Sequence, residues 1–306
     1  MNAALLEATD PRGFLLKHLN AGVRPDGRAN PPFSSRKVSV TSSGGKSTVR
    51  IGENCATCVV HPLLGEPGVI HAEAGTSDGL CGHVPVAGPV SEAGSAAFIL
   101  GNTPFPAFPF IAVPYRWPQR SGLFSKWGPE VFDPSQLCVV EGHVVWQLHL
   151  VITVLSVDGS VMDVCMRAAV EALRSVELPA LFAGDALSDR AGDVNLQAIT
   201  TSEVGRELAK ARGVVMGSIP GSVTLALLSD DKTWLLPDPT ASEEQACGGA
   251  IIVVVTYEEG TRKGPSPTVL TYLPSFDGDA DIPSSFLEDD AVQMAIKIRA
   301  ATVKKD

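Results

Sequence analysis

Gly22-Val23-Arg24-Pro25-Asp26-Gly27-Arg28 lies between a predicted N-terminal helix and the first predicted strand. Its centre has the chemistry of a turn, because Pro25 fixes φ, Asp26 can bond to its own backbone, and Gly27 tolerates a positive φ. The residues alone therefore predict a corner at which the chain passes from helix to strand. Two arginines flank that corner.

The first half of the chain combines short strands with one long helix. Asp10-Pro11 is typical of an N-cap and first helical position, and the helix that it opens is expected to end at Gly22. The predicted strands of this half are 37–41, 47–51 and 56–61, followed by two apolar runs within 137–157. Glycine-rich turns between the first three favour a meander. After Asp158-Gly159 the apolar period becomes that of an amphipathic helix over 162–176.

The second half repeats this order of strands followed by a helix. Its predicted strands are 222–228, 233–236, 250–257 and 269–273. Ser284-Ser285 is expected to cap a final helix that runs to about residue 303. Its expected buried residues are Phe286, Val292, Met294, Ala295 and Ile298. Two strand blocks, each closed by a helix, predict an α+β fold with helices packed against mixed or antiparallel sheets.

Composition limits the kinds of function. The 306 residues are 44% hydrophobic, and the net charge of −10 disfavours a protein that grips nucleic acid alone by neutralising phosphates. Any RNA contact should be local or shared with more basic partners. No apolar run reaches the ~18 residues of a membrane span. Residues 1–20 contain Glu7, Asp10 and Arg12 where a secretory signal would be apolar, so we expect a soluble intracellular protein without a membrane partner.

Three motifs suggest metal or phosphate sites, and each has a simpler interpretation. Cys55-Ala-Thr-Cys58 lies in a predicted strand, where residues three apart point to opposite faces, which disfavours zinc. Residues 43–47 contain Gly-Lys-Ser, but they lack the first glycine of a P-loop and a strand follows them. Residues 277–281 have calcium-loop spacing, but Ile282 stands where the loop needs glycine. We therefore predict no metal and no cofactor.

The turn motif resembles the G-x-R-x-D-G-R signature of the RNase PH-like family, which includes bacterial tRNA-trimming enzymes and the exosome ring. Residues 52–60 are similar to a G-x-T-x-V-x-x-x-V strand of that family, and Asp158-Gly159 with the helix after it resembles its D-G-x-x-x-D-A segment. Residues 236–244 resemble the D-P-T-x-x-E-E signature of the inactive exosome ring branch. The similarity spans about residues 12 to 303, and the stretch from 79 to 134 matches poorly.

The resemblance implies an RNase PH-like fold of two related β-α halves, with helices packed on mixed sheets. It also implies three segments in the chain. These are an N-terminal helix and entry turn at 1–35, a first half at 36–180, and a second half with the C-terminal helix at 181–306.

The resemblance also bears on catalysis. Active members of the family carry Thr-Arg where this chain has Ser160-Val161, and a valine cannot hold an oxyanion. Of their D-x-D-Y-x-E-D acidic run, only Asp238 keeps a counterpart here. We therefore predict no catalytic residues. The alternative is a phosphate-dependent 3'-to-5' exoribonuclease of the same fold.

The proline-rich stretch from 79 to 134 contains the candidate RNA-binding residues. No acidic residue occurs from 93 to 129, and Arg116, Arg120 and Lys126 are interleaved with aromatic residues. Guanidinium and ammonium groups bind phosphates while aromatic rings stack on bases, which suits single-stranded RNA. The alternative is that this stretch packs on its own domain or on a neighbouring subunit.

The resemblance as a whole implies a non-catalytic ring subunit of a eukaryotic exosome, nearest the exosome component eight type. Such subunits assemble the ring and line the channel that carries RNA towards 3'-to-5' processing and degradation. The implied partners are other RNase PH-like exosome ring subunits, RNA-binding cap subunits and single-stranded RNA. The implied locations are the nucleus, nucleolus and cytoplasm. A third possibility is a structural partner that does not touch RNA.

Overall fold

The computed structural model describes thirteen stretches of the chain. They are residues 3–29, 35–65, 86–87, 96–100, 133–140, 144–179, 181–187, 194–198, 212–229, 233–247, 249–258, 267–276 and 290–303. The helices are α1 (Ala3–Thr9), α2 (Pro11–Asn20), α3 (Val161–Arg174), α5 (Ala241–Ala246) and α7 (Val292–Val303), with a short 3-10 helix at Pro134–Leu137. No helix in these stretches is both long and apolar enough to cross a membrane.

The strands form two principal sheets and two short pairs. They are β1 (Val38–Ser43), β2 (Lys46–Ile51), β3 (Asn54–Gly65), β4 (Val86–Ala87), β5 (Ala96–Leu100), β6 (Cys138–Val140), β7 (Val144–Ser156), β8 (Glu177–Leu178), β9 (Leu181–Leu187), β10 (Val194–Ala198), β11 (Arg212–Gly213), β12 (Ser218–Ser229), β13 (Thr233–Pro237), β14 (Gly249–Glu258) and β15 (Pro267–Phe276). The first sheet has the order β1-β2-β3-β7-β5-β4, with β6 also paired to β7. The second has the order β13-β12-β14-β15. The short pairs are β9 with β10 and β8 with β11.

The predicted meander is confirmed in the first sheet. β1, β2 and β3 pair in sequence order, and each pair is antiparallel. Gly44 and Gly45 make the first hairpin with φ values of 56° and 75°, a region that glycine enters without steric strain. The Gly-Lys-Ser sequence is therefore the corner of a hairpin, as the missing P-loop glycine indicated.

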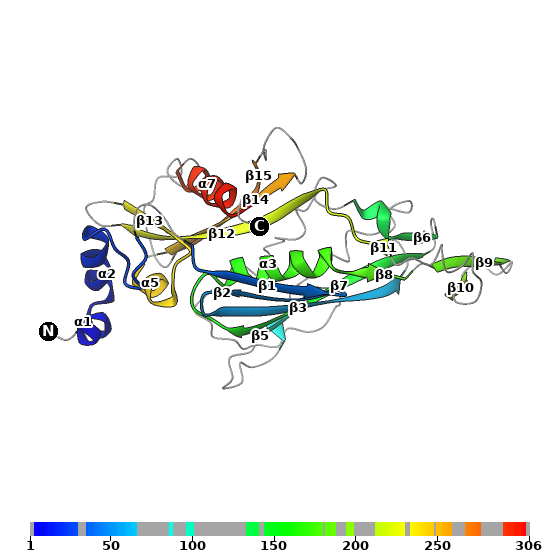
Figure 1. Ribbon diagram of the computed structural model, residues 1–306, viewed down its shortest axis with the longest axis horizontal. Coiled ribbons are helices and arrows are strands. Elements are labelled where there is room, and N and C mark those ends of the chain that lie inside the picture. Colours follow the sequence, from blue (N-terminus) through cyan, green and yellow to red (C-terminus); the bar gives the residue numbers. More distant parts are fainter. Residues whose placement is uncertain are drawn as a thin grey trace.

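α3 lies between the two principal sheets, as Figure 1 shows. It contacts β2, β3 and β7 of the first sheet on one side and β12 of the second on the other. Because both sides of the helix are covered, most of its side chains are buried. Met166, Ala169 and Leu173 belong to the largest hydrophobic core, together with Ile152 and Val154 of β7.

The second sheet is covered by α7 on the face away from α3 (Figure 1). Val292, Met294 and Ile298 of α7 pack against a separate core that includes Leu225 and Ile251, which confirms this part of the predicted final helix. The molecule is therefore layered in the order first sheet, α3, second sheet, α7. The sequence predicted sheets that are either mixed or antiparallel, and all pairings between the described strands are antiparallel. The α+β class is confirmed. Phe286 and the predicted cap at Ser284-Ser285 lie outside the described residues.

The N-terminal helices lie at one end of the molecule, beside α5 (Figure 1). Asp10 caps α2 as predicted, since its carboxylate accepts a hydrogen bond from the Gly13 N–H at 2.8 Å. Leu15 and Leu19 of α2 are buried in a third core with Leu228 and Leu236 of the second sheet. α2 is therefore attached to the second half of the chain, although the sequence places it before the first. The segment boundaries at 35 and 180 stay a prediction.

Candidate functional site

The entry turn and the D-P-T-x-x-E-E segment meet in space, although more than 200 residues separate them. Arg24 is 1% exposed and donates from Nε to Oε1 of Glu243 at 2.7 Å. Its Nη2 bonds the other oxygen of Glu243, and its Nη1 donates to the Pro237 carbonyl at 2.7 Å. This paired, two-point contact fixes the entry turn against the end of β13.

Asp238 accepts hydrogen bonds on both carboxylate oxygens. Its Oδ1 receives Nε and Nη2 of Arg36 at 3.0 and 2.7 Å. Its Oδ2 receives the Arg36 backbone N–H at 2.8 Å and Nη1 of Arg28 at 3.1 Å. Asp238 itself has a φ of 49°, a conformation that non-glycine residues seldom adopt without tertiary support. The residue that matches the acidic run of active RNase PH-like enzymes is therefore bonded to two arginines, Arg28 and Arg36.

The Asp158-Gly159 turn, in the first half of the chain, lies beside the same side chains. We call Arg24, Arg28, Arg36, Asp158, Asp238 and Glu243 the arginine and carboxylate cluster. Arg36 donates from Nη1 to the Asp158 carbonyl at 2.6 Å and to its carboxylate at 3.0 Å. Asp158 Oδ1 also accepts the N–H of Ala241, the first residue of α5, at 3.1 Å. The buried Asn54 amide bonds the turn on its other side, to the Asp158 N–H and the Gly159 carbonyl.

Gly159 is required by close packing. It has a φ of 67°, and a Cβ added there would collide with the carbonyl of Pro239 and the backbone of Thr240. The turn before α3 therefore lies directly against the segment that follows Asp238.

Ser160-Val161 and Asp238 are neighbours, so the structure brings together the two positions on which the catalytic prediction depended. The Ser160 hydroxyl donates to the Pro239 carbonyl at 3.0 Å, and the Ser160 N–H donates to Oε1 of Glu244 at 2.8 Å. Val161 packs against the principal core. The side chains at the family's phosphate-holding position thus contact protein groups.

Two carboxyl groups near this cluster have raised pKa values. Burial raises the pKa of Glu244 to about 7, although the Ser160 N–H and the charge of Arg36 act in the opposite direction. Burial also raises the pKa of Asp163, in the first turn of α3, to about 6, against the hydrogen bond from the Thr224 N–H. For Arg36, burial would lower the pKa, but its bonds and attraction to Asp238 outweigh burial and raise it.

α5 and the roles of Arg36 and Asn54 were not predicted from the sequence. A signal for α5 was present, since Thr240-Ala-Ser-Glu243 is a capping box. The Thr240 side chain accepts the Glu243 N–H, and the Glu243 carboxylate accepts the Thr240 N–H at 2.9 Å. Arg36 and Asn54 carried no motif, and only the tertiary structure reveals their contacts.

The predicted RNA-binding residues Arg116, Arg120 and Lys126 lie outside the described residues, as does the acidic stretch 277–281. Cys55 and Cys58 lie in β3, as the strand interpretation required, and burial raises the pKa of the Cys58 thiol to about 12. Within the stretches described above, no group of three or more His, Cys, Asp or Glu side chains could hold a metal ion.

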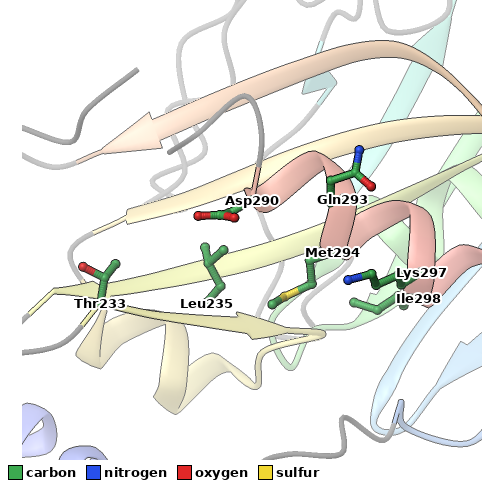
Figure 2. Close-up of a pocket in the computed structure, with 7 residues that line it drawn as sticks. All are labelled: Thr233, Leu235, Asp290, Gln293, Met294, Lys297 and Ile298. Carbon is green, nitrogen blue, oxygen red and sulfur yellow. The ribbon is translucent and has the colours of Figure 1, made fainter. Parts of the chain in front are cut away.

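A separate hollow lies between α7 and the edge strand β13 (Figure 2). Its lining residues are Thr233, Leu235, Asp290, Gln293, Met294, Lys297 and Ile298. In Figure 2, Leu235, Met294 and Ile298 supply its apolar side chains, while Asp290 and Gln293 lie towards the top of the view. It contains none of the residues of the arginine and carboxylate cluster.

Comparison with solved structures identifies the fold. The chain resembles a subunit of the Archaeoglobus fulgidus exosome with RNA bound to its active site, with a TM-score of 0.62 and 20% identity over 99% of this chain and 98% of that one. A subunit of an archaeal exosome core gives a TM-score of 0.58 and 18% identity over 96% and 94% of the two chains. The chain therefore has the RNase PH-like fold of exosome cores, as the motifs predicted.

Comparison of sequences identifies the relatives within that class. The chain is 28% identical over 254 residues to the exosome complex component Rrp42 of Thermoplasma volcanium, covering 82% of each protein. It is 27% identical over 244 residues to the exosome complex component RRP45 of Danio rerio, covering 80% of this chain and 55% of that protein. No protein-family model matches the chain. Its homologues are exosome components of the Rrp42 and RRP45 types, which confirms the predicted relationship.

Proposed function

We propose that this chain is a non-catalytic structural subunit of an exosome ring. In this role it supports 3'-to-5' RNA processing and degradation by helping to assemble the ring and to line its RNA channel. The proposal that the subunit is non-catalytic rests on the hydrogen bonds of Asp238, since both of its carboxylate oxygens are bonded to arginines. A general acid or base must exchange a proton with the substrate, and a carboxylate held in this way has no oxygen free to do so.

The names of the relatives support the ring assignment, since both are exosome complex components. The edge of the first sheet supports assembly as well. β1 ends that sheet, and all six of its residues are exposed, including Val38 and Val40. An exposed edge strand with apolar side chains favours pairing with another chain.

The proposed partners are other RNase PH-like ring subunits, RNA-binding cap subunits and single-stranded RNA in the channel. Arg116, Arg120 and Lys126 are the proposed RNA contacts. Assignment to the exosome component eight type, and locations in the nucleus, nucleolus and cytoplasm, belong to the same proposal. They rest on the sequence resemblance alone.

The test uses the tagged chain purified together with its ring partners, which mass spectrometry identifies. The chain alone and the complex are then incubated with labelled single-stranded RNA and inorganic phosphate. We expect partner subunits of the RNase PH-like class, and no nucleoside diphosphate from the chain alone.

The alternative, a phosphate-dependent exoribonuclease, makes the opposite prediction. Nucleoside diphosphate release that is lost in a folded Asp238→Asn variant, but kept in Asp26→Asn, would overturn the non-catalytic assignment. Recovery of the chain without any ring subunit would overturn the assembly role.

A further inference from the structure

We infer that the Glu244 carboxylate is a resident anion at the N-terminal end of α3, and that it keeps external oxyanions such as inorganic phosphate out of that position. The inference deepens the proposed function and rests on it, because it names the group that occupies the position where a phosphate-dependent enzyme of this fold would need its anion.

The N-terminal end of α3 is suited to an anion. A helix leaves its first N–H groups without intrahelical partners, and its dipole places partial positive charge there. In α3, which has 14 residues, the N-cap residue Ser160 makes no side-chain cap, and its hydroxyl donates to the Pro239 carbonyl. The Ser160 N–H precedes the first intrahelical hydrogen bonds, so its acceptor comes from elsewhere in the chain.

Glu244 supplies that acceptor. Its Oε1 lies 2.8 Å from the Ser160 nitrogen, and the two residues are 84 positions apart in sequence. The carboxylate also feels the positive charge of Arg36, whose guanidinium bonds Asp158 and Asp238. A backbone N–H at a helix N-terminus beside a guanidinium is the environment that binds phosphate groups in proteins.

The position of Glu244 is fixed by the arginine and carboxylate cluster. α5 carries Glu244, and the capping box of Thr240 and Glu243 defines where α5 begins. Glu243 is bound by the buried Arg24, while Asp158 accepts the first N–H of α5. The helix therefore cannot swing away to admit a free anion without breaking these contacts.

Burial opposes the charge of Glu244, since desolvation raises its pKa to about 7. The carboxylate is consequently fully charged only above about pH 7, and its exclusion of other anions should be strongest there. Removing it should leave a partly desolvated position that still offers the Ser160 N–H and the nearby guanidinium.

The experiment measures how the melting temperature depends on inorganic phosphate. The proteins are the wild type, Glu244→Ala, which removes both the charge and the side-chain volume, and Glu244→Gln, which removes the charge alone. Glu177→Ala is the matched control, because it deletes an exposed carboxylate beyond the other end of α3. Chloride at equal ionic strength corrects for screening.

We expect phosphate to raise the melting temperature of Glu244→Ala by roughly 3 °C at about ten times its dissociation constant. Glu244→Gln should give a smaller rise, and the wild type and Glu177→Ala should give none beyond chloride. Equal rises in the wild type and Glu244→Ala, or a rise in Glu177→Ala, would overturn the inference. So would the absence of a specific rise in both Glu244 variants.

If Glu244→Ala does not fold, Glu244→Gln decides the matter, because the amide keeps the size of the side chain and should fold while the charge that excludes phosphate is gone. A phosphate-specific rise in its melting temperature would then support the inference, and its absence would overturn it. RNA shortening is measured on the same samples. Phosphate-dependent shortening by the wild type would contradict the proposed function, whereas a lack of phosphate binding by the variants would contradict only the role of Glu244.

Discussion

At the scale of single residues, Arg28 and Arg36 contribute four hydrogen-bond donors to the Asp238 carboxylate. Asp238 therefore stabilises the fold by holding these two arginines in place. The sequence singled out Asp238 as the one acid retained from a catalytic run, but it could not reveal that Arg36, which has no motif, lies beside it. Contacts between residues some 200 positions apart depend on the whole fold, which is why the members of the cluster could be named in part but not paired.

We expect Asp238→Asn to lower the free energy of unfolding by about 2–4 kcal/mol. The change removes the negative charge while leaving two guanidinium groups largely buried, which is the unfavourable way to break an ion pair. Urea unfolding followed by circular dichroism measures the effect. Asp26→Asn is the control, because Asp26 pairs with Arg28 at a more exposed place and should lose less than about 1 kcal/mol. Equal losses in the two variants would contradict the clamping role of Asp238.

Asp163 should make the protein less stable as pH rises. Its pKa is about 6 in the folded protein and near 3.8 without burial, so the unfolded chain releases this proton first. The penalty is absent below about pH 4 and complete above about pH 6, and it amounts to about 3 kcal/mol. Asp163→Asn, which cannot ionise, should therefore gain stability relative to the wild type between pH 4 and pH 7. Parallel pH profiles for the two proteins would refute this, and the exposed Asp290→Asn is the control.

At the scale of helices and strands, the sequence predicted those elements whose formation depends on residues close together in the chain. The β1 to β3 meander and α3 followed from alternation and helical periodicity. β12 instead begins at Ser218, four residues before the predicted start. The prediction began the strand too late because Pro220 and Gly221 are typical of a turn. Both residues pair with β14, while β13 pairs with β12 only from Leu225 onward. Among the described strands, Pro220 thus lies where β12 has one neighbour, and proline is tolerated at such a position.

The start of α5 can be tested at this scale. Thr240→Ala removes the side chain that accepts the Glu243 N–H, so we expect a loss of about 1 kcal/mol in the free energy of unfolding. Gln245→Ala, an exposed change on the same helix, should have almost no effect. Chemical denaturation of the two variants gives the comparison. A Thr240→Ala loss no larger than that of Gln245→Ala would mean that Arg24 and Asp158 alone hold α5 in place.

At the scale of the whole molecule, the cluster joins parts of the chain that the layered fold would otherwise leave apart. Arg24 belongs to the entry turn, Asp158 to the loop before α3, and Asp238 to the end of the second sheet. The chain also carries a net charge of −10, which disfavours RNA binding by the chain alone. RNA contact would therefore depend on a local group of cations and on the neighbouring subunits in a ring.

The contribution of this chain's own cations to RNA contact can be tested by mutation. Replacing Arg116, Arg120 and Lys126 together by alanine should leave the ring assembled but weaken crosslinking of this subunit to threaded RNA. Each lost phosphate contact should lower the slope of log affinity against log salt by roughly 0.7. The loss of affinity should be modest, because we expect other ring subunits to supply cations to the same path. Unchanged crosslinking and slope in an intact ring would assign these residues to protein packing, whereas a ring that dissociates would identify them as anchors of a subunit interface.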